Sequence, residues 1–402
     1  MKSRDAAAAL CVAALLILPA IGAEPFPRAT PESVGLNAAR LKDASDLLHR
    51  FVAEKKIAGG VAAVARRGRL VYLEAAGVQD LETRTPMTER SMFRIYSMTK
   101  PVTAVAAMML HERGKFALTD PVAKFIPEFK SMVVSSPDGT TRPPARPMTI
   151  QDLLLHTSGL NHRTSQLYQK ERVRSRAQSL PQFIANIVRV PLMDDPGVRY
   201  RYSESPTVVG RLVEIWSGQP LDRFFANEIF QPLGMTDTTF WVSPEQAARF
   251  TTRYAGGANG LTANEGEDVP FTVRPALLEG AVGLVSTAPD FLRFSQMLLN
   301  KGELGGVRLL SSSSVESMTV NGLTEAMVKE RNGMGWGIGN VEVVVDPAAQ
   351  KVSASRGEYG WNGSAGTYFW NDPSLDMITI LMTQFADRLP AQFKTLVRQA
   401  AE

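Results

Sequence analysis

Ser97 and Lys100 stand three residues apart where a long apolar segment, residues 101–110, begins. The segment predicts a helix that opens at Ser97 and ends before Gly114, and residues i and i+3 share one face of a helix. A helix start also offers unpaired N–H groups and partial positive charge. A hydroxyl, an amine and N–H donors are the minimum set for an acyl-enzyme hydrolase. Ser-x-x-Lys is also a common solvated helix start, so further residues must decide.

A lysine that accepts the serine proton needs help. Free lysine titrates near ~10.4, so burial, neighbouring cations or a second group must assist it. Tyr202 is a candidate for that second group, since it follows the turn Pro196-Gly197 and precedes an apolar helix from Pro206. This context predicts a loop edge facing a cleft. A packing role for the same tyrosine is the plainer alternative.

Composition bounds the protein class. The chain has 402 residues, 44% hydrophobic and 21% charged, which fits one large globular domain or two lobes. The net charge is +4, and no run of basic residues alternates with aromatics, so nucleic acid is not expected as a partner.

The N-terminus has the layout of a secretory signal. A basic start at residues 1–4 precedes an apolar stretch at 6–21 and small residues up to Ala23. We expect a signal peptide over 1–23 and a periplasmic or secreted protein with no membrane contact after cleavage; an uncleaved anchor is the alternative. Cys11 is the one cysteine. The mature chain would therefore have no disulfide, thiolate nucleophile or cysteine-ligated metal, and neither a metal nor a cofactor is expected.

Strand patterns lie near both ends of the chain and helical patterns lie between them. We expect an α+β fold, a three-layer α/β/α arrangement with an antiparallel sheet flanked by helices. Residues 24–114 and 276–402 would form the sheet domain and 115–275 a mainly helical insert. The expected elements are a helix from the N-cap Asn37, a hairpin over 61–65 and 70–75, helices from Asp120-Pro121 and Thr149, strands at 341–345, 366–370 and 377–382, and a helix over 390–400.

Three segments together resemble one family. Ser97-x-x-Lys100, Tyr202-Ser203 before a helix, and Trp361-Asn362-Gly363 before a strand resemble the three motifs of the serine β-lactamase and penicillin-binding superfamily. The nearest branch is the class C-like family VIII carboxylesterases, and the likeness covers about residues 30–400. The resemblance implies a β-lactamase/DD-peptidase-like fold.

The resemblance also implies roles for these residues. Ser97 would be acylated, and Lys100 and Tyr202 would handle its proton. The backbone N–H groups of Ser97 and Ser364 would form the oxyanion hole, as such donors do in acyl transfer. Trp361, Asn362 and Gly363 would line the acyl pocket. His156 is a candidate for the histidine of a catalytic triad, but the resemblance implies a structural role.

Two residues depart from the family pattern. The third motif of the penicillin-recognising relatives begins with a lysine that holds the substrate carboxylate, and Trp361 stands there instead. A flat apolar wall suits a neutral ester better than a β-lactam or a peptide terminus, each of which carries a carboxylate. The second motif usually reads Tyr-Ser-Asn, and Glu204 replaces the asparagine. A carboxylate near Lys100 favours its charged form, so either Glu204 points elsewhere or Tyr202 does more of the base work.

We therefore expect a secreted serine carboxylesterase acting on small esters, with a small-molecule ester or amide as its partner. A class C-like β-lactamase or D-Ala-D-Ala peptidase is the first alternative, with Arg163 or Arg201 as a substitute carboxylate anchor. A catalytically silent binding protein on the same scaffold is the second, kept open by Glu204. The sequence fixes neither the natural substrate nor the oligomeric state.

Overall fold

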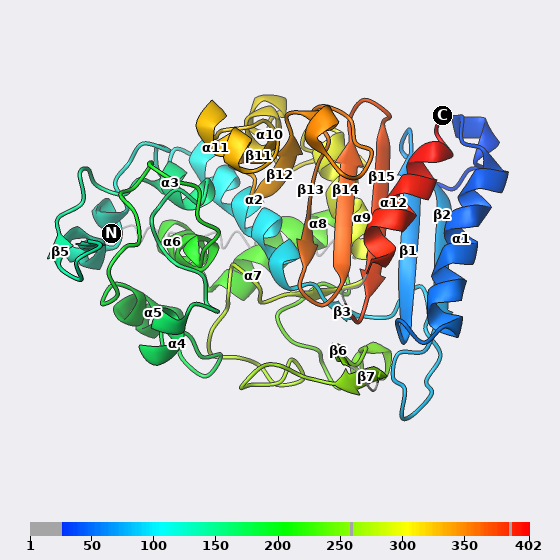
Figure 1. Ribbon diagram of the computed structural model, residues 1–402, viewed down its shortest axis with the longest axis horizontal. Coiled ribbons are helices and arrows are strands. Elements are labelled where there is room, and N and C mark those ends of the chain that lie inside the picture. Colours follow the sequence, from blue (N-terminus) through cyan, green and yellow to red (C-terminus); the bar gives the residue numbers. More distant parts are fainter. Residues whose placement is uncertain (1–25, 258–259, 386–387) are drawn as a thin grey trace, which may run out of the picture.

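The computed structural model describes residues 26–257, 260–385 and 388–402. Its centre is an antiparallel sheet of seven strands in the order β11-β12-β13-β14-β15-β1-β2 (Figure 1). Strands from both ends of the chain meet where β1 pairs with β15. The strands of this sheet are β1 Gly59–Arg66, β2 Arg69–Gly77, β11 Met334–Gly337, β12 Val341–Val344, β13 Tyr359–Gly363, β14 Thr367–Asp372 and β15 Met377–Thr383. This sheet confirms the expected fold class.

Each face of the sheet buries its own core. Successive side chains of a strand point to opposite faces, so Val61 and Ala63 join the large core on the side of α2 and α9, whereas Ala62 and Val64 pack under α1 and α12. Both faces of β1 are therefore buried, which explains its unbroken apolar run. The longest helices are α1 Ala38–Ala53, α2 Thr99–Glu112, α6 Ser205–Ser217, α9 Ala288–Leu299 and α12 Leu389–Gln399.

The helical part of the chain lies across α2 from the sheet (Figure 1). Helix α2 packs against α6, and all its residues from Thr99 to Leu110 are buried. The shorter helices are α3 Ile150–Leu154, α4 Gln166–Lys170, α5 Leu180–Ile187, α7 Leu221–Phe225, α8 Gln231–Leu233, α10 Ser312–Thr319 and α11 Glu325–Glu330. The small two-stranded pairs are β3 Phe93–Arg94 with β8 Val285–Ser286, β4 Val134–Ser135 with β5 Thr141–Arg142, β6 Tyr254–Gly257 with β7 Gly260–Ala263, and β9 Glu303–Leu304 with β10 Val307–Arg308.

Local signals placed several helix ends correctly. Asn37 caps α1 by accepting from the N–H of Arg40, and Thr149 with Asp152 forms a capping box at the start of α3. Gly114 follows α2 in a left-handed conformation, at φ 69°.

Two local expectations were wrong. Asp120-Pro121 does not open an α-helix: a 3₁₀ turn, Val122–Lys124, follows, because Pro121 forms an isolated β-bridge with Thr149. Helix α2 begins at Thr99, so Ser97 lies in the preceding 3₁₀ turn. The third motif ends β13, and the strand expected after it is β14, which begins at Thr367.

The expected signal peptide, residues 1–23, lies outside the described residues. Within the part of the chain that the structure describes, no helix is long and apolar enough to cross a membrane. The same residues contain no group of three or more His, Cys, Asp or Glu side chains placed to hold a metal ion.

Candidate active site

The Ser97 hydroxyl is held at the end of a buried helix. Ser97 belongs to the 3₁₀ turn Tyr96–Met98, which runs directly into α2. From 91 to 110, Ser97 is the one residue that is not buried. Tyr96 has φ 38°, a left-handed conformation that is unusual for a bulky residue and costs free energy. Surrounding contacts must therefore hold this turn in place.

Those contacts come from the sheet and from an aromatic neighbour. The ring of Tyr96 meets the ring of Phe271 edge to face, with centroids 5.9 Å apart. On the other side, β13 packs closely against the turn at Gly363. A Cβ at this position would lie 2.3 Å from both the carbonyl oxygen of Ile95 and Oγ1 of Thr367. Only glycine permits this approach, which brings the end of β13 beside Ser97.

Lys100 reaches back from the first turn of α2 to Ser97. Its Nζ lies 3.3 Å from the Ser97 Oγ and donates to the carbonyl oxygen of Ala281 at 2.9 Å. The side chain is 1% exposed. The same Nζ lies 4.6 Å from the centre of the Tyr202 ring, over its face. The structure therefore brings Ser97, Lys100 and Tyr202 together, with the amine between the hydroxyl and the tyrosine.

Tyr202 is fixed by the rings around it. The Nε1–H of Trp361 donates to its phenolic oxygen over 3.3 Å. His156 and His162 lie against the same ring, with centroids 4.8 and 5.4 Å away. Trp336, which is buried, packs edge to face against Trp361 at 4.6 Å. These rings form an apolar wall beside the hydroxyl and leave the phenolic oxygen with an indole donor.

His156 supports the loop that carries Tyr202. Its Nδ1 accepts from the backbone N–H of Ser203 at 3.2 Å, so this nitrogen carries no proton. Its carbonyl oxygen accepts from the N–H of Arg201 at 2.7 Å. Burial, followed by the positive charges of Lys100 and Arg331, holds the pKa of His156 well below its usual value. The imidazole is thus a neutral part of the packing.

Glu204 turns its carboxylate toward its own helix. It is the N-cap residue of α6 and is 1% exposed. Its Oε2 accepts from the hydroxyl of Thr207 at 3.2 Å, and its N–H donates to the carbonyl oxygen of Asn161. A carboxylate at a helix N-terminus is favourable. Of the two readings that the sequence left open, the geometry favours the one in which this carboxylate points elsewhere.

Ser364 follows Gly363 in the turn between β13 and β14. The turn is anchored by Gly366, whose N–H donates to the Gly363 oxygen at 2.9 Å and whose oxygen accepts from the N–H of Thr383 at 2.9 Å. Ser364 itself is exposed. Its backbone is thus held at the end of β13, the end that packs against the Ser97 turn.

Trp361 and Asn362 reach different faces of β13. Trp361 pairs with Phe369 on the side of α2, and Asn362 pairs with Tyr368 on the side of α12. Both residues nevertheless border one groove, which Asn362 lines from the outer face of the sheet. Their place in an acyl pocket stays a prediction.

The two arginines considered as carboxylate anchors are already engaged. Arg201 donates from Nε to Asp194 at 2.7 Å. Arg163 lies 3.7 Å from a carboxylate oxygen of Glu267, and its guanidinium sits 5.7 Å from the Tyr96 ring centre. Of the two, Arg163 is the one placed beside the Ser97 turn.

Comparisons with known proteins find relatives over most of the chain. The family model described as Beta-lactamase matches residues 44–401. Esterase EstB of Burkholderia gladioli is 30% identical over 89% of this chain and 93% of its own length. A Mycobacterium tuberculosis protein, Rv1367c, is 34% identical over 82% of this chain and 86% of its own. The solved structure of EstCE1, described as a hydrolase with promiscuous acyltransferase activity, superposes with a TM-score of 0.78, 26% identity and coverage of 92% of this chain and 99% of its own.

Proposed function

The chain belongs to the beta-lactamase family and is a serine hydrolase, and on this premise we propose that it is an exported carboxylesterase for esters with a compact acyl group. The observation that carries the proposal is the position of the Lys100 amine between the other two groups. Its Nζ lies 3.3 Å from the Ser97 Oγ and 4.6 Å from the Tyr202 ring centre. The similarity of the whole chain to EstB and EstCE1 also supports ester hydrolysis.

In the proposed acylation step, the Ser97 Oγ attacks the ester carbonyl carbon. Its proton passes to Lys100 and Tyr202 as the new C–O bond forms. The backbone N–H groups of Ser97 and Ser364 stabilise the oxyanion; each such donor is typically worth about 10²–10³ in rate. The bond to the leaving alkoxide then breaks, and Tyr202 returns the proton to it as alcohol. Water attacks the acyl-enzyme by the reverse sequence and releases the acid.

Trp361 favours esters that carry no charge beside the scissile bond. Its indole occupies the place where the resemblance puts a lysine for a substrate carboxylate, and it donates to Tyr202 at 3.3 Å instead of offering a charge. An indole cannot form the ion pair that binds a carboxylate. A β-lactam or a peptide ending in a carboxylate would lose that anchor.

The experiment compares three assays on the purified chain. Wild type should hydrolyse a chromogenic butyrate ester, label with a fluorophosphonate, and leave a chromogenic cephalosporin almost untouched. Ser97→Ala should lose both ester hydrolysis and labelling, whereas Ser364→Ala, which keeps the backbone N–H, should retain most of the activity. Efficient cephalosporin hydrolysis would favour the β-lactamase alternative. Absence of labelling in wild type would favour a silent binding protein.

Export is part of the same proposal and is tested separately. The layout of residues 1–23 supports it. Expression of the full chain in a Gram-negative host, followed by fractionation and N-terminal sequencing, should find a periplasmic protein that starts at Glu24. A cytoplasmic protein that retains Met1 or Lys2 at its terminus would exclude export.

A further inference from the structure

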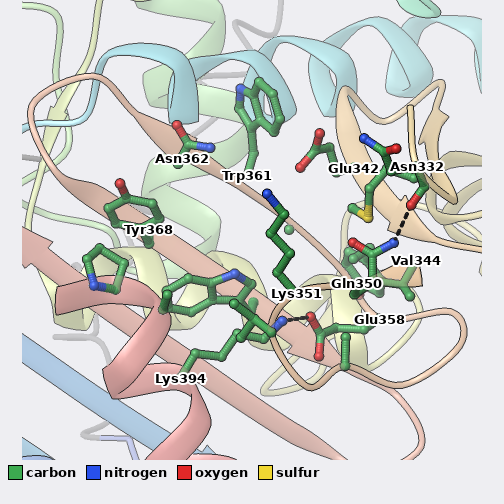
Figure 2. Close-up of a pocket in the computed structure, with 18 of the residues that line it drawn as sticks. Asn332, Glu342, Val344, Gln350, Lys351, Glu358, Trp361, Asn362, Tyr368 and Lys394 are labelled. Atoms are coloured by element: carbon green, nitrogen blue, oxygen red, sulfur yellow. Dashed lines mark hydrogen bonds and ion pairs between the residues drawn. The ribbon is translucent and has the colours of Figure 1, made fainter. Parts of the chain in front are cut away.

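A cavity opens on the outer face of the sheet. A groove of about 670 Å³ lies between β12, β13, β14, the loop after β12 and the start of α12 (Figure 2). Asn362 and Tyr368 line one side, and Lys351 extends into its middle. Trp361, whose indole donates to Tyr202, borders it. The groove and the candidate catalytic site therefore share a wall.

The groove reaches the catalytic side around an open strand edge. Strand β12 pairs with β13 only at Tyr359 and Gly360. From Trp361 to Gly363, β13 has no neighbouring strand on that side among the residues that the structure describes. A substrate whose carbonyl lies beside Ser97 would have to pass this edge of β13 to reach the groove.

An aromatic platform forms the floor of the groove. The rings of Tyr368 and Trp370 are stacked, with centroids 5.4 Å apart and planes 16° from parallel, and both are half-buried. The cross-strand partner of Trp370 is Gly360. A glycine there puts no β13 side chain beside the indole, and the Nζ of Lys394 lies 5.8 Å from its ring centre. A flat aromatic ligand can extend such a half-buried stack.

The reach of the platform matches a substrate of moderate size. Its two rings stand opposite Asn362 and Gly360, one and three residues before Gly363. At about 3.3 Å per residue, the platform spans from about 3 to about 10 Å along the strand from the end that adjoins Ser97. A fused bicyclic ring on the leaving group covers that span.

Among the described residues that line the groove, one basic side chain has no acidic partner. Among its lining residues are three basic ones, Arg331, Lys351 and Lys394, and two acidic ones, Glu342 and Glu358. Arg331 pairs with Glu342 at 2.7 Å, and Lys394 pairs with Glu358. Lys351 has no ion pair with any residue that the structure describes. The groove therefore has a net positive charge at its centre.

We propose that this groove binds the leaving-group part of the ester substrate, as a flat aromatic ring that carries a carboxylate. The ring extends the stack of Tyr368 and Trp370, and Lys351 binds the acid. The acid lies remote from the scissile carbonyl, which stays beside the uncharged wall of Trp361. This inference rests on the proposed function, because it names the substrate class of the same catalytic site.

A matched ester pair tests the proposal: 2-naphthyl acetate and 6-carboxy-2-naphthyl acetate. Wild type should have a KM about tenfold lower for the carboxylated ester, the effect of one hydrogen bond to a charged group. Lys351→Met should bring the ratio of the two KM values close to one, and Lys351→Glu should invert it. Lys115→Met removes an exposed lysine elsewhere and should keep the wild-type ratio. Because Lys351 is exposed, added salt should weaken the preference.

Tyr368→Leu tests the platform, and it should raise the KM of both naphthyl esters relative to ethyl acetate. The proposal is overturned if wild type shows no preference for the carboxylated ester. It is also overturned if Lys351→Met keeps the preference, or if Lys115→Met loses it equally.

Failure of the catalytic assignment can be recognised separately. Ser97→Ala should bind 6-hydroxy-2-naphthoate, measured by quenching of tryptophan fluorescence, and the double variant with Lys351→Met should bind it about tenfold more weakly. Such binding without any ester hydrolysis by wild type would contradict the proposed function and leave the groove assigned. Hydrolysis of ethyl acetate without this binding would contradict the groove alone.

Discussion

The indole Nε1–H of Trp361 donates to the phenolic oxygen of Tyr202 over 3.3 Å, so the residue that replaces a charged anchor also contacts a proposed proton carrier. This bond links substrate choice to proton transfer.

Trp361→Phe should reduce kcat for a neutral ester by about threefold to tenfold, the usual worth of one hydrogen bond. Trp361→Lys should lower the same rate and raise the relative rate on a chromogenic cephalosporin. The ratio of kcat/KM for ester and cephalosporin in the three proteins provides the measurement. An unchanged ratio in Trp361→Lys would show that this position does not set substrate charge.

His156→Ala should act mainly on stability. The substitution leaves a cavity against Tyr202 and Trp336 and removes the acceptor of the Ser203 N–H, so we expect a loss of about 3–5 kcal/mol in the free energy of unfolding. Thermal unfolding and kcat at 20 °C should be measured on the same sample. A well-folded variant with an unchanged melting temperature and no activity would instead make His156 a catalytic residue.

Glu204→Gln should leave catalysis nearly intact, because the carboxylate points toward α6 and accepts from the Thr207 hydroxyl. The amide oxygen can still accept, but the favourable charge at the helix start is lost, at a cost of about 0.3–1 kcal/mol. Urea unfolding and ester hydrolysis test this. A rise of tenfold or more in kcat would show that Glu204 restrains Lys100 as a base.

Asp290 should make stability depend on pH. Burial raises its pKa from 3.8 to about 7, while Thr238 and the N–H of Asp237 partly oppose that shift. The folded protein thus holds the proton more tightly than the unfolded chain. This contribution is complete below about pH 3.8 and is lost as the pH rises through about 7.

Asp290→Asn resembles the protonated form and cannot ionise. Between pH 5 and pH 8 the wild type should therefore lose about 1–3 kcal/mol relative to this variant, because each pH unit below a folded-state pKa of about 7 contributes about 1.4 kcal/mol. Denaturant titrations at the two pH values supply the comparison. Equal pH dependence in both proteins would exclude Asp290 as the source.

Signals within a few residues predicted much of the fold. The cap at Asn37, the capping box at Thr149 and the glycine after α2 are local, and each was visible in the sequence. The β-rich composition of residues 366–370 and 377–382 located β14 and β15. Asp120-Pro121 failed because its conformation depends on pairing with Thr149, which is distant in sequence.

The site could be predicted only in part, because some of its features also depend on contacts between residues distant in sequence. Motif order identified Ser97, Lys100 and Tyr202, and the structure brings them together. The left-handed Tyr96 was not foreseeable, because the close approach of Gly363 holds its turn. The groove is formed by residues that share one face of the sheet and by the loop that carries Lys351. No local sequence pattern predicts either arrangement.

The most direct test of the central claim is a search for the acyl-enzyme. The purified chain should be quenched in acid during turnover of p-nitrophenyl butyrate, digested and analysed by tandem mass spectrometry. We predict one butyryl group on the Ser97 oxygen, absent from Ser97→Ala and present in Ser364→Ala. Butyryl on another side chain, or turnover by the Ser97→Ala protein at the wild-type rate, would contradict the account.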